Sequence, residues 1–195
     1  MSIYKSDHYN SKSMKSLSKL IYYLFGWKEE GGVPDGITKA VFLIAPHTSS
    51  WDFYIGRLYC WIHKIPINLL IKKEAFIWPL GGLLKKAGGI PVNRSRATSK
   101  VVQIAKMFRE RDPMFLGIAP EGTRKLSKRW KMGFYHIAVE AKVPILLSYI
   151  DYKRKAAGVG PPFWPTGDME KDIKEIEEFY RDKGAKYPEK FNLSS

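Results

Sequence analysis

Short apolar runs recur along most of the chain, and their lengths are those of β-strands. Several runs place apolar residues at consecutive positions rather than at alternating ones, which is typical of strands covered on both faces, as in a parallel sheet. Strands are therefore predicted at residues 40–46, 66–73, 88–94, 114–121 and 143–152.

Segments of helical length separate these runs, with apolar residues three and four positions apart. Helices are predicted near residues 52–63, 79–87, 98–111, 131–141 and 168–183. The segment 153–167 is too rich in glycine and proline for a helix, so we expect a further strand or a loop there. Strands that alternate with helices indicate an α/β fold, with one domain built on a largely parallel central sheet flanked by helices.

The N-terminal segment has a different pattern. Its apolar burst covers only residues 20–27, whereas a membrane-spanning helix needs roughly 20 apolar residues. On a helix, the apolar residues between 17 and 25 would share one face with lysines around it. That pattern fits a helix lying in a membrane interface and fits equally a helix packed on the core. We therefore divide the chain into an N-terminal amphipathic, membrane-associating segment at 1–30 and a globular domain at 31–195.

Composition narrows the class of protein. Apolar residues fill 45% of the 195 positions, enough for the core of one domain. Lysine and arginine outnumber aspartate and glutamate 33 to 19, and the formal charge of +14 favours a polyanionic ligand or an anionic surface. The single cysteine, Cys60, allows no intrachain disulfide and favours a reducing compartment. Its spacing from the four histidines is not that of a metal site, so no metal is expected.

A histidine and an aspartate follow the first predicted strand, in the stretch FLIAPHTSSWDF at residues 42–53. Ligand sites of parallel sheets form at the carboxyl ends of strands. Residues five apart on one helix point in different directions, so His47 and Asp52 can meet only if the histidine precedes the helix and the aspartate lies in its first turn. The aspartate would then orient the imidazole for general-base catalysis. On this pair alone, a histidine that caps the helix or is hydrogen-bonded in the core is the simpler interpretation.

The predicted strand at 114–121 ends in a second polar motif, Pro120–Arg124. A glycine turn with free backbone amides, a threonine hydroxyl and an arginine together suit the binding of an anion, most readily phosphate. Arg94 stands in a similar place at the tip of the strand at 88–94. Each could be an ordinary turn with a solvated arginine, but their joint placement at strand ends favours a phosphate site.

Together these motifs resemble the glycerolipid acyltransferase family, which includes the 1-acylglycerol-3-phosphate acyltransferases. Four blocks of that family match in order, on His47 with Asp52, on Gly88–Arg94, on Pro120–Arg124 and on Val143–Ile145. Lys72 is the best match to the lysine-bearing strand between the first two blocks. The chain departs from the family at Ala119, where phenylalanine is common, and at Pro91, within a strand usually filled by aliphatic residues.

The resemblance implies that residues 31–195 are an acyltransferase domain. It would move a fatty acyl chain from an acyl thioester to a lysophospholipid hydroxyl, converting 1-acylglycerol-3-phosphate to phosphatidate. Glycerol 3-phosphate or a lyso-aminolipid is the alternative acceptor. The donor would be acyl-CoA or acyl-carrier protein, and no cofactor is needed. His47 and Asp52 would be catalytic, and the substrate-binding residues would be Lys72, Arg94, Glu121, Gly122, Thr123 and Arg124.

The basic charge raises a rival class, a nucleic-acid-binding protein, but the cations are scattered and no nucleic-acid-binding module is recognisable. A catalytically silent lipid-binding relative is a third interpretation, which the presence of both His47 and Asp52 disfavours. We expect no nucleic-acid partner. We expect instead a cytoplasmic protein held peripherally at the anionic inner face of a membrane.

Overall fold

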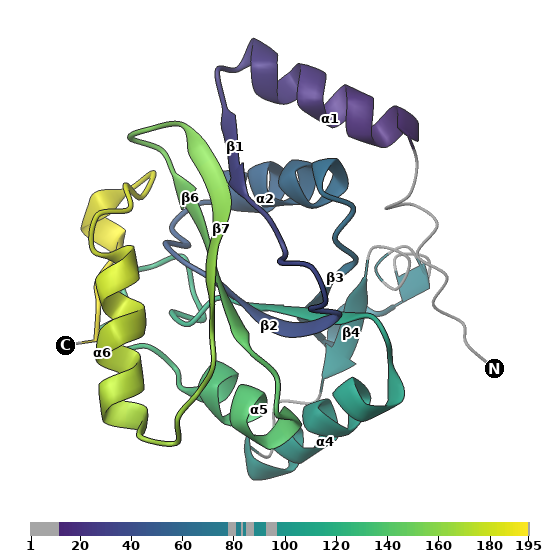
Figure 1. The fold of residues 1–195 in the computed structure, drawn as a ribbon, viewed down its shortest axis with the longest axis vertical. Helices are drawn as coiled ribbons and strands as arrows, with labels where there is room; N and C mark the ends of the chain where they lie inside the picture. The colour runs from purple at the N-terminus through teal and green to yellow at the C-terminus, as the bar shows by residue number, and fades with distance from the viewer. Residues whose placement is uncertain (1–11, 78–80, 83, 85–87, 93–96, 195) are drawn as a thin grey trace.

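The sheet that positions the candidate site runs through the middle of the molecule (Figure 1). The computed structural model describes residues 12–77, 81–82, 84, 88–92 and 97–194. Within them, a seven-stranded sheet has the order β1-β7-β6-β2-β5-β3-β4. Its strands are β1 (Lys28–Gly31), β2 (Lys39–Ile44), β3 (Ile67–Lys72), β4 (Gly89–Val92), β5 (Met114–Ile118), β6 (Ile145–Asp151) and β7 (Ala156–Phe163).

The largely parallel sheet expected from the sequence is confirmed. The strands from β2 to β6 are mutually parallel, whereas β7 runs antiparallel to β6 and carries β1 parallel to itself on the outer edge. β7 occupies most of the glycine- and proline-rich segment at 153–167. Pro91 lies in β4, an edge strand, where a missing backbone N–H is tolerated. β1 was not predicted, because its sequence KEEG has no apolar run.

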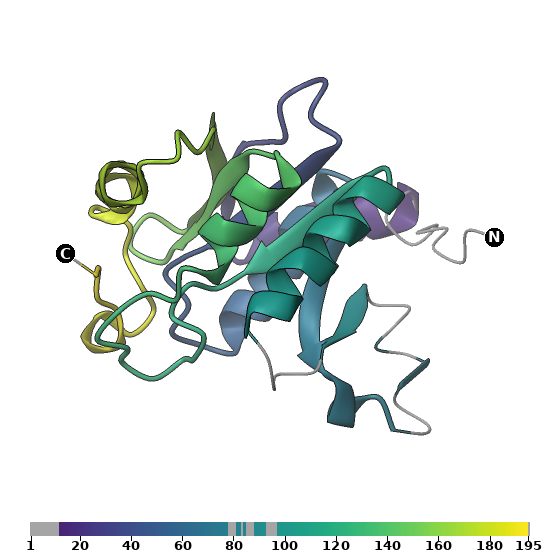
Figure 2. The ribbon, with the colours of Figure 1, turned by 90° about the horizontal axis from the view of Figure 1, so that it is seen from below.

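Helices cover both faces of the sheet (Figures 1 and 2). They are α1 (Lys12–Leu24), α2 (Trp51–Ile62), α4 (Ala97–Glu110), α5 (Gly133–Ala141) and α6 (Met169–Tyr180). α1 and α2 lie over one face, and α4, α5 and α6 lie over the other, with α4 beside α5 in Figure 2. Most of the helix predicted at 79–87 lies outside the described residues. Within that range residues 81, 82 and 84 are described, and they are helical.

Each face of the sheet has its own hydrophobic core, and β2 contributes to both. Val41 and Leu43 pack with α4, α5 and α6, whereas Ala40 and Phe42 pack with α1 and α2. All four side chains are buried. Because successive side chains of a strand point to opposite faces, a strand covered on both sides is apolar at every position. This explains the uninterrupted apolar run that predicted β2.

α1 has one buried face and one exposed apolar face. Ser18 and Tyr22 are buried against α2, and the Tyr22 hydroxyl donates a 2.8 Å hydrogen bond to the carbonyl of Ile55. The exposed apolar side chains on and just after the helix are Leu17, Leu20, Tyr23, Leu24 and Phe25. β1, which follows, spans the boundary that we placed after residue 30, and it joins the sheet. Of the helices in the described part of the chain, none combines the length and apolar character needed to cross a membrane.

Candidate active site

Three neighbouring strands end beside one another at the candidate site. β2 lies between β5 and β6 and is parallel to both, so their carboxyl ends meet at one edge of the sheet. His47 follows β2, Glu121 follows β5, and Tyr152 follows β6. The parallel topology thus brings together residues that lie far apart in the sequence.

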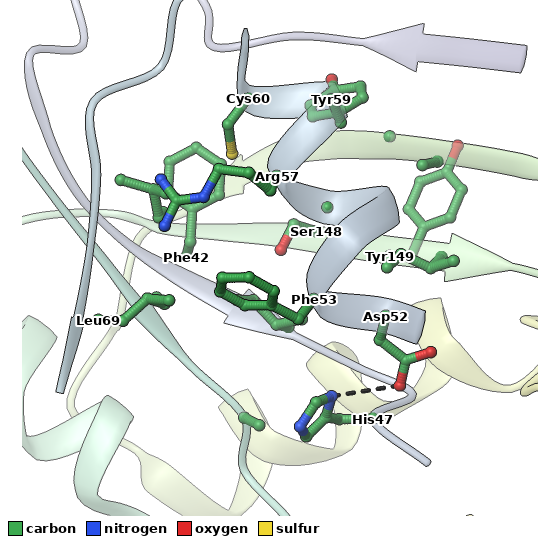
Figure 3. Close-up of a pocket in the computed structure, with 18 of the residues that line it drawn as sticks. Phe42, His47, Asp52, Phe53, Arg57, Tyr59, Cys60, Leu69, Ser148 and Tyr149 are labelled. Atoms are coloured by element: carbon green, nitrogen blue, oxygen red, sulfur yellow. Dashed lines mark ion pairs between the residues drawn. The ribbon is translucent and has the colours of Figure 1, made fainter. Parts of the chain in front are cut away.

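The predicted histidine–aspartate pair is formed. His47 Nδ1 lies 3.2 Å from Asp52 Oδ2, at the N-terminal end of α2 (Figure 3). The two atoms are within ion-pairing distance but are not aligned as a hydrogen bond. The Asp52 side chain is 1% exposed and that of His47 is 26% exposed. Asp52 is therefore shielded behind a histidine that solvent and ligands can reach.

Local hydrogen bonds at the start of α2 explain why Asp52 points back toward His47. Asp52 Oδ2 accepts a 2.9 Å hydrogen bond from the backbone N–H of Ser49, whose Oγ accepts one from the N–H of Trp51. These two hydrogen bonds tie the Asp52 carboxylate to the turn that precedes α2. Ser50, the N-cap residue of α2, makes no side-chain cap hydrogen bond, and Thr48 Oγ1 accepts a hydrogen bond from the N–H of Tyr187.

Glu121 supports the histidine from the other side. Its Oε1 accepts a 3.0 Å hydrogen bond from the backbone N–H of His47, so it contacts the main chain of the histidine and not its ring. Glu121 is 2% exposed, and its Oε2 is buried with no hydrogen-bond partner among the described residues. Burial raises the pKa of this carboxyl above its ordinary value. A buried carboxyl thus fixes the loop that carries His47.

The last three residues of the Pro120–Arg124 motif, Gly122, Thr123 and Arg124, form an exposed turn. The N–H of Gly122 donates to the carbonyl of Ala119 at 3.1 Å, and Gly122 has a φ of +64°. A Cβ added there would approach Lys131 Nζ to 2.6 Å, so glycine lets this lysine lie against the turn. Arg124 contacts the hydroxyl of Ser50, beside α2, and the Thr123 hydroxyl accepts a hydrogen bond from the N–H of Lys125.

An apolar cavity of 410 Å³ leads away from His47 between α2 and the sheet. Its lining includes Phe42, Phe53, Gly56, Cys60, Leu69 and Ile150. In Figure 3, His47 and Asp52 lie at one end of α2, and Cys60 lies toward the other end. Burial raises the pKa of the Cys60 thiol to about 12, so Cys60 is an apolar lining group and not a nucleophile.

A second hollow of 1630 Å³ opens on the opposite side of His47 and is basic. Its charged lining residues are Lys100, Arg124, Lys131 and Glu140. We call this hollow the basic cleft. His47, Leu70, Gly117 and Ala119 line both the cavity and the cleft. His47 therefore stands where an apolar compartment meets a cationic one, and the small side chain of Ala119 lies at the same junction.

The predicted site residues do not all lie in the described structure. His47, Asp52, Glu121, Gly122, Thr123 and Arg124 gather within one region. Lys72 ends β3 at the same edge of the sheet, but its side chain is not described. Arg94 lies outside the described residues. In the described part of the chain, no three histidine, cysteine, aspartate or glutamate side chains are grouped in a way that could hold a metal ion.

Sequence reasoning missed two residues of the site. Lys131 reaches the Gly122 turn from the segment before α5, and Tyr152 donates a 2.7 Å hydrogen bond to Asp52 Oδ1 from the end of β6. Tyr152 is the last residue of the strand predicted at 143–152, as Glu121 is of the strand predicted at 114–121, so the strand-end rule could have identified it. No local pattern marks Lys131.

Comparisons with known proteins assign the chain to a family. The family model described as Acyltransferase matches residues 29–150, which hold the His47–Asp52 pair and the Pro120–Arg124 motif. The chain belongs to the Acyltransferase family. The chain is also 31% identical over 115 residues to a 1-acyl-sn-glycerol-3-phosphate acyltransferase of Cocos nucifera. The match covers 56% of this chain and 36% of the plant protein, so the chain spans well under half the length of that relative.

The fold also resembles a solved acyltransferase. The crystal structure of the 1-acyl-sn-glycerophosphate (LPA) acyltransferase PlsC from Thermotoga maritima matches with a TM-score of 0.58 and 18% sequence identity. The match covers 86% of this chain and 75% of that one. The acyltransferase fold expected from the sequence is thereby confirmed.

Proposed function

We propose that the protein transfers a fatty acyl chain from an acyl thioester to a hydroxyl of a lysophospholipid. The observation that carries the proposal is the place of His47 between the apolar cavity and the basic cleft. An acyl chain is apolar and a phosphate is anionic, so each compartment suits one part of the substrates. The reacting thioester and hydroxyl would meet at the histidine.

The His47–Asp52 pair supports a general-base mechanism without an acyl-enzyme intermediate. His47 Nε2 takes the proton of the acceptor hydroxyl as its oxygen attacks the thioester carbonyl carbon. Asp52, 3.2 Å from Nδ1, stabilises the imidazolium that forms. When the carbon–sulfur bond breaks, the imidazolium returns the proton to the departing thiolate. The products are the acylated lipid and a free thiol.

The basic cleft supports a phosphate-bearing acceptor, with 1-acylglycerol-3-phosphate as the first choice. Arg124 presents a planar guanidinium that can bind two phosphate oxygens, and Lys131 adds a second cation across Gly122. Glycerol 3-phosphate shares that phosphate and is the alternative acceptor, as is a lyso-aminolipid. The donor is acyl-CoA or acyl-carrier protein, both of which are polyanions suited to a chain of charge +14.

The exposed apolar face of α1 supports peripheral binding to a membrane. Its five exposed apolar side chains gain free energy when they leave water, and a large exposed apolar patch often marks an interaction site. Lysines beside the face would add roughly 1 kcal/mol each on anionic lipid. Such binding would bring the site to its lipid acceptor at an anionic, cytoplasmic membrane face.

The proposal is tested by assaying the purified protein with radiolabelled acyl-CoA and with acyl-carrier protein. The acceptors are 1-acylglycerol-3-phosphate, glycerol 3-phosphate, another lysophospholipid and a lyso-aminolipid. We expect the fastest transfer to 1-acylglycerol-3-phosphate, because it carries both a phosphate for the cleft and an acyl chain that places it in the membrane. Faster transfer to glycerol 3-phosphate or to the aminolipid would reassign the acceptor. The absence of transfer from either donor to all acceptors would refute the proposed function.

A further inference from the structure

Tyr152 contacts the candidate catalytic pair from outside the segments that carry the family's sequence blocks. It is the first residue after β6 and lies 100 positions from Asp52 in the sequence. Its hydroxyl donates a 2.7 Å hydrogen bond to Asp52 Oδ1. The other carboxylate oxygen, Oδ2, accepts from the N–H of Ser49 and faces His47. The two oxygens of Asp52 therefore have separate partners.

The tyrosine ring is itself held in place. Trp27 meets it edge-on, with ring centroids 5.3 Å apart, and Lys186 Nζ lies 5.7 Å from its centroid. Burial, followed by the hydrogen bond and charge of Asp52, raises the pKa of the phenol well above its ordinary value. The hydroxyl consequently stays protonated across the physiological range and acts toward Asp52 as a donor.

A carboxylate as buried as Asp52 needs a donor on each oxygen, because an unsatisfied buried acceptor is costly. Without the hydroxyl of Tyr152, Oδ1 would lose the hydrogen bond it now accepts, and the carboxylate would be free to turn about its Cβ–Cγ bond. Rotation would carry Oδ2 away from His47 Nδ1. The N–H of Ser49 alone holds only one of the two oxygens.

We propose that Tyr152 is a positioning residue of the acyltransferase site, which acts on His47 through Asp52. The inference rests on the proposed acyl transfer and adds a third member to the pair. Tyr152 touches neither reacting group. It fixes the rotation of the carboxylate that faces the imidazole, and it links the end of β6 to the start of α2.

Packing is the competing explanation, since Tyr152 is also a half-buried member of the core between the sheet and α2. Tyr152→Phe separates the two roles, because phenylalanine keeps the ring between Trp27 and Lys186 and removes only the hydroxyl. Tyr22→Phe is the matched control. It removes a buried tyrosine hydroxyl from the same core, one that donates to the carbonyl of Ile55 and not to the pair.

The two variants and the wild-type protein are compared in thermal midpoint, kcat and KM for acyl-CoA and 1-acylglycerol-3-phosphate. We expect Tyr152→Phe to lower kcat by roughly 10-fold or more, as for a lost hydrogen bond to a charged group, with both KM values within twofold. Tyr22→Phe should keep its kcat. An unchanged kcat in Tyr152→Phe, a loss confined to KM, or an equal loss in Tyr22→Phe would each overturn the proposal.

A double-mutant cycle tests whether the effect passes through Asp52. Single-turnover rates with excess enzyme are measured for Asp52→Asn and for Asp52→Asn combined with Tyr152→Phe. We expect the second substitution to cost less than twofold in the Asp52→Asn background, because the carboxylate that Tyr152 holds is already gone. Full additivity would overturn the proposal. Inactive wild-type protein would refute the acyl transfer itself, which is a separate result.

Discussion

Two buried carboxyl groups flank His47 and are held very differently. Asp52 receives donors on both oxygens, from Ser49 and Tyr152, and lies beside the imidazole. Glu121 receives the backbone N–H of His47 on one oxygen only, and its other oxygen is buried without a partner in the described structure. The first arrangement stabilises a charge, whereas the second makes a charge costly. The same functional group, a carboxyl, therefore serves two purposes within one site.

Glu121→Gln should make stability less dependent on pH. Because burial raises the pKa of Glu121, the folded protein binds this proton more tightly than the unfolded chain does. The wild-type protein therefore loses stability as pH rises from the ordinary carboxyl range through the raised pKa. Glutamine can still accept from His47 N–H and carries no charge. As pH rises from 4 to 8, we expect the thermal midpoint of the variant to increase relative to that of the wild-type protein. A constant difference across that range would contradict this.

Arg124→Lys should weaken the binding of the acceptor more than the binding of the donor. A lysine keeps the charge but cannot form the two parallel hydrogen bonds of a guanidinium to phosphate. We expect the KM for 1-acylglycerol-3-phosphate to rise several-fold and the KM for acyl-CoA to change less. The matched control is Arg181→Lys. Arg181 is exposed, follows α6 directly and pairs with Glu178. Equal losses toward acceptors with and without phosphate would refute the phosphate assignment.

At the scale of elements, α1 has two faces with two different consequences. Its buried face reaches α2 through Tyr22, while its exposed face carries apolar side chains such as Leu20 and Leu24. Trp27 follows the helix and supports the ring of Tyr152. The sequence left membrane binding and core packing as alternatives for this helix, and the structure shows that packing on α2 leaves an apolar face uncovered.

Substitutions on the two sides of this segment should separate membrane binding from chemistry. Replacing both Leu20 and Leu24 by glutamate should abolish sedimentation with vesicles that contain anionic lipid, and should leave transfer between detergent-dispersed substrates within twofold. Trp27→Ala should do the opposite, lowering kcat while vesicle binding persists. Binding of the wild-type protein should weaken with salt. Unchanged sedimentation of the double glutamate variant would remove α1 as the membrane contact.

The success of sequence reasoning differed among the elements for physical reasons. β2 was predictable because both of its faces are buried, and β1 was not, because an edge strand of sequence KEEG has no apolar pattern. The pairing of His47 with Asp52 followed from short spacing at a strand end. The contact between Tyr152 and Asp52 spans 100 residues and depends on β6 being the neighbour of β2, which no local pattern specifies.

At the scale of the whole molecule, the sheet separates two compartments that meet at its carboxyl edge. The apolar cavity lies on the α2 side, and the basic cleft lies on the side of α4 and α5. Two small residues, Gly117 and Ala119, line both compartments. The departure from the family's phenylalanine at position 119 thus falls where the two hollows join.

The far end of the cavity should set the length of the acyl chain. Cys60 lies there, toward the opposite end of α2 from His47 (Figure 3). Cys60→Phe should fill part of the 410 Å³ and shift preference toward shorter acyl-CoA donors in a competition assay. Cys60→Ala, the matched control, should keep the wild-type preference for longer acyl-CoA donors. Thermal midpoints check for overpacking. A proportional loss for all chain lengths in Cys60→Phe would contradict a role for the cavity in holding the chain.

The central claim is that His47 is the base of an acyl transfer, and the rate of phosphatidate formation by the His47→Ala variant tests it most directly. Wild-type protein and variant are incubated with radiolabelled acyl-CoA and 1-acylglycerol-3-phosphate, after circular dichroism has shown that both are folded. We expect product from the wild-type protein and a fall of at least about 100-fold in kcat for the variant, the size that positioned acid–base groups contribute. Near-normal turnover by the folded variant would contradict the assignment of His47 as the base.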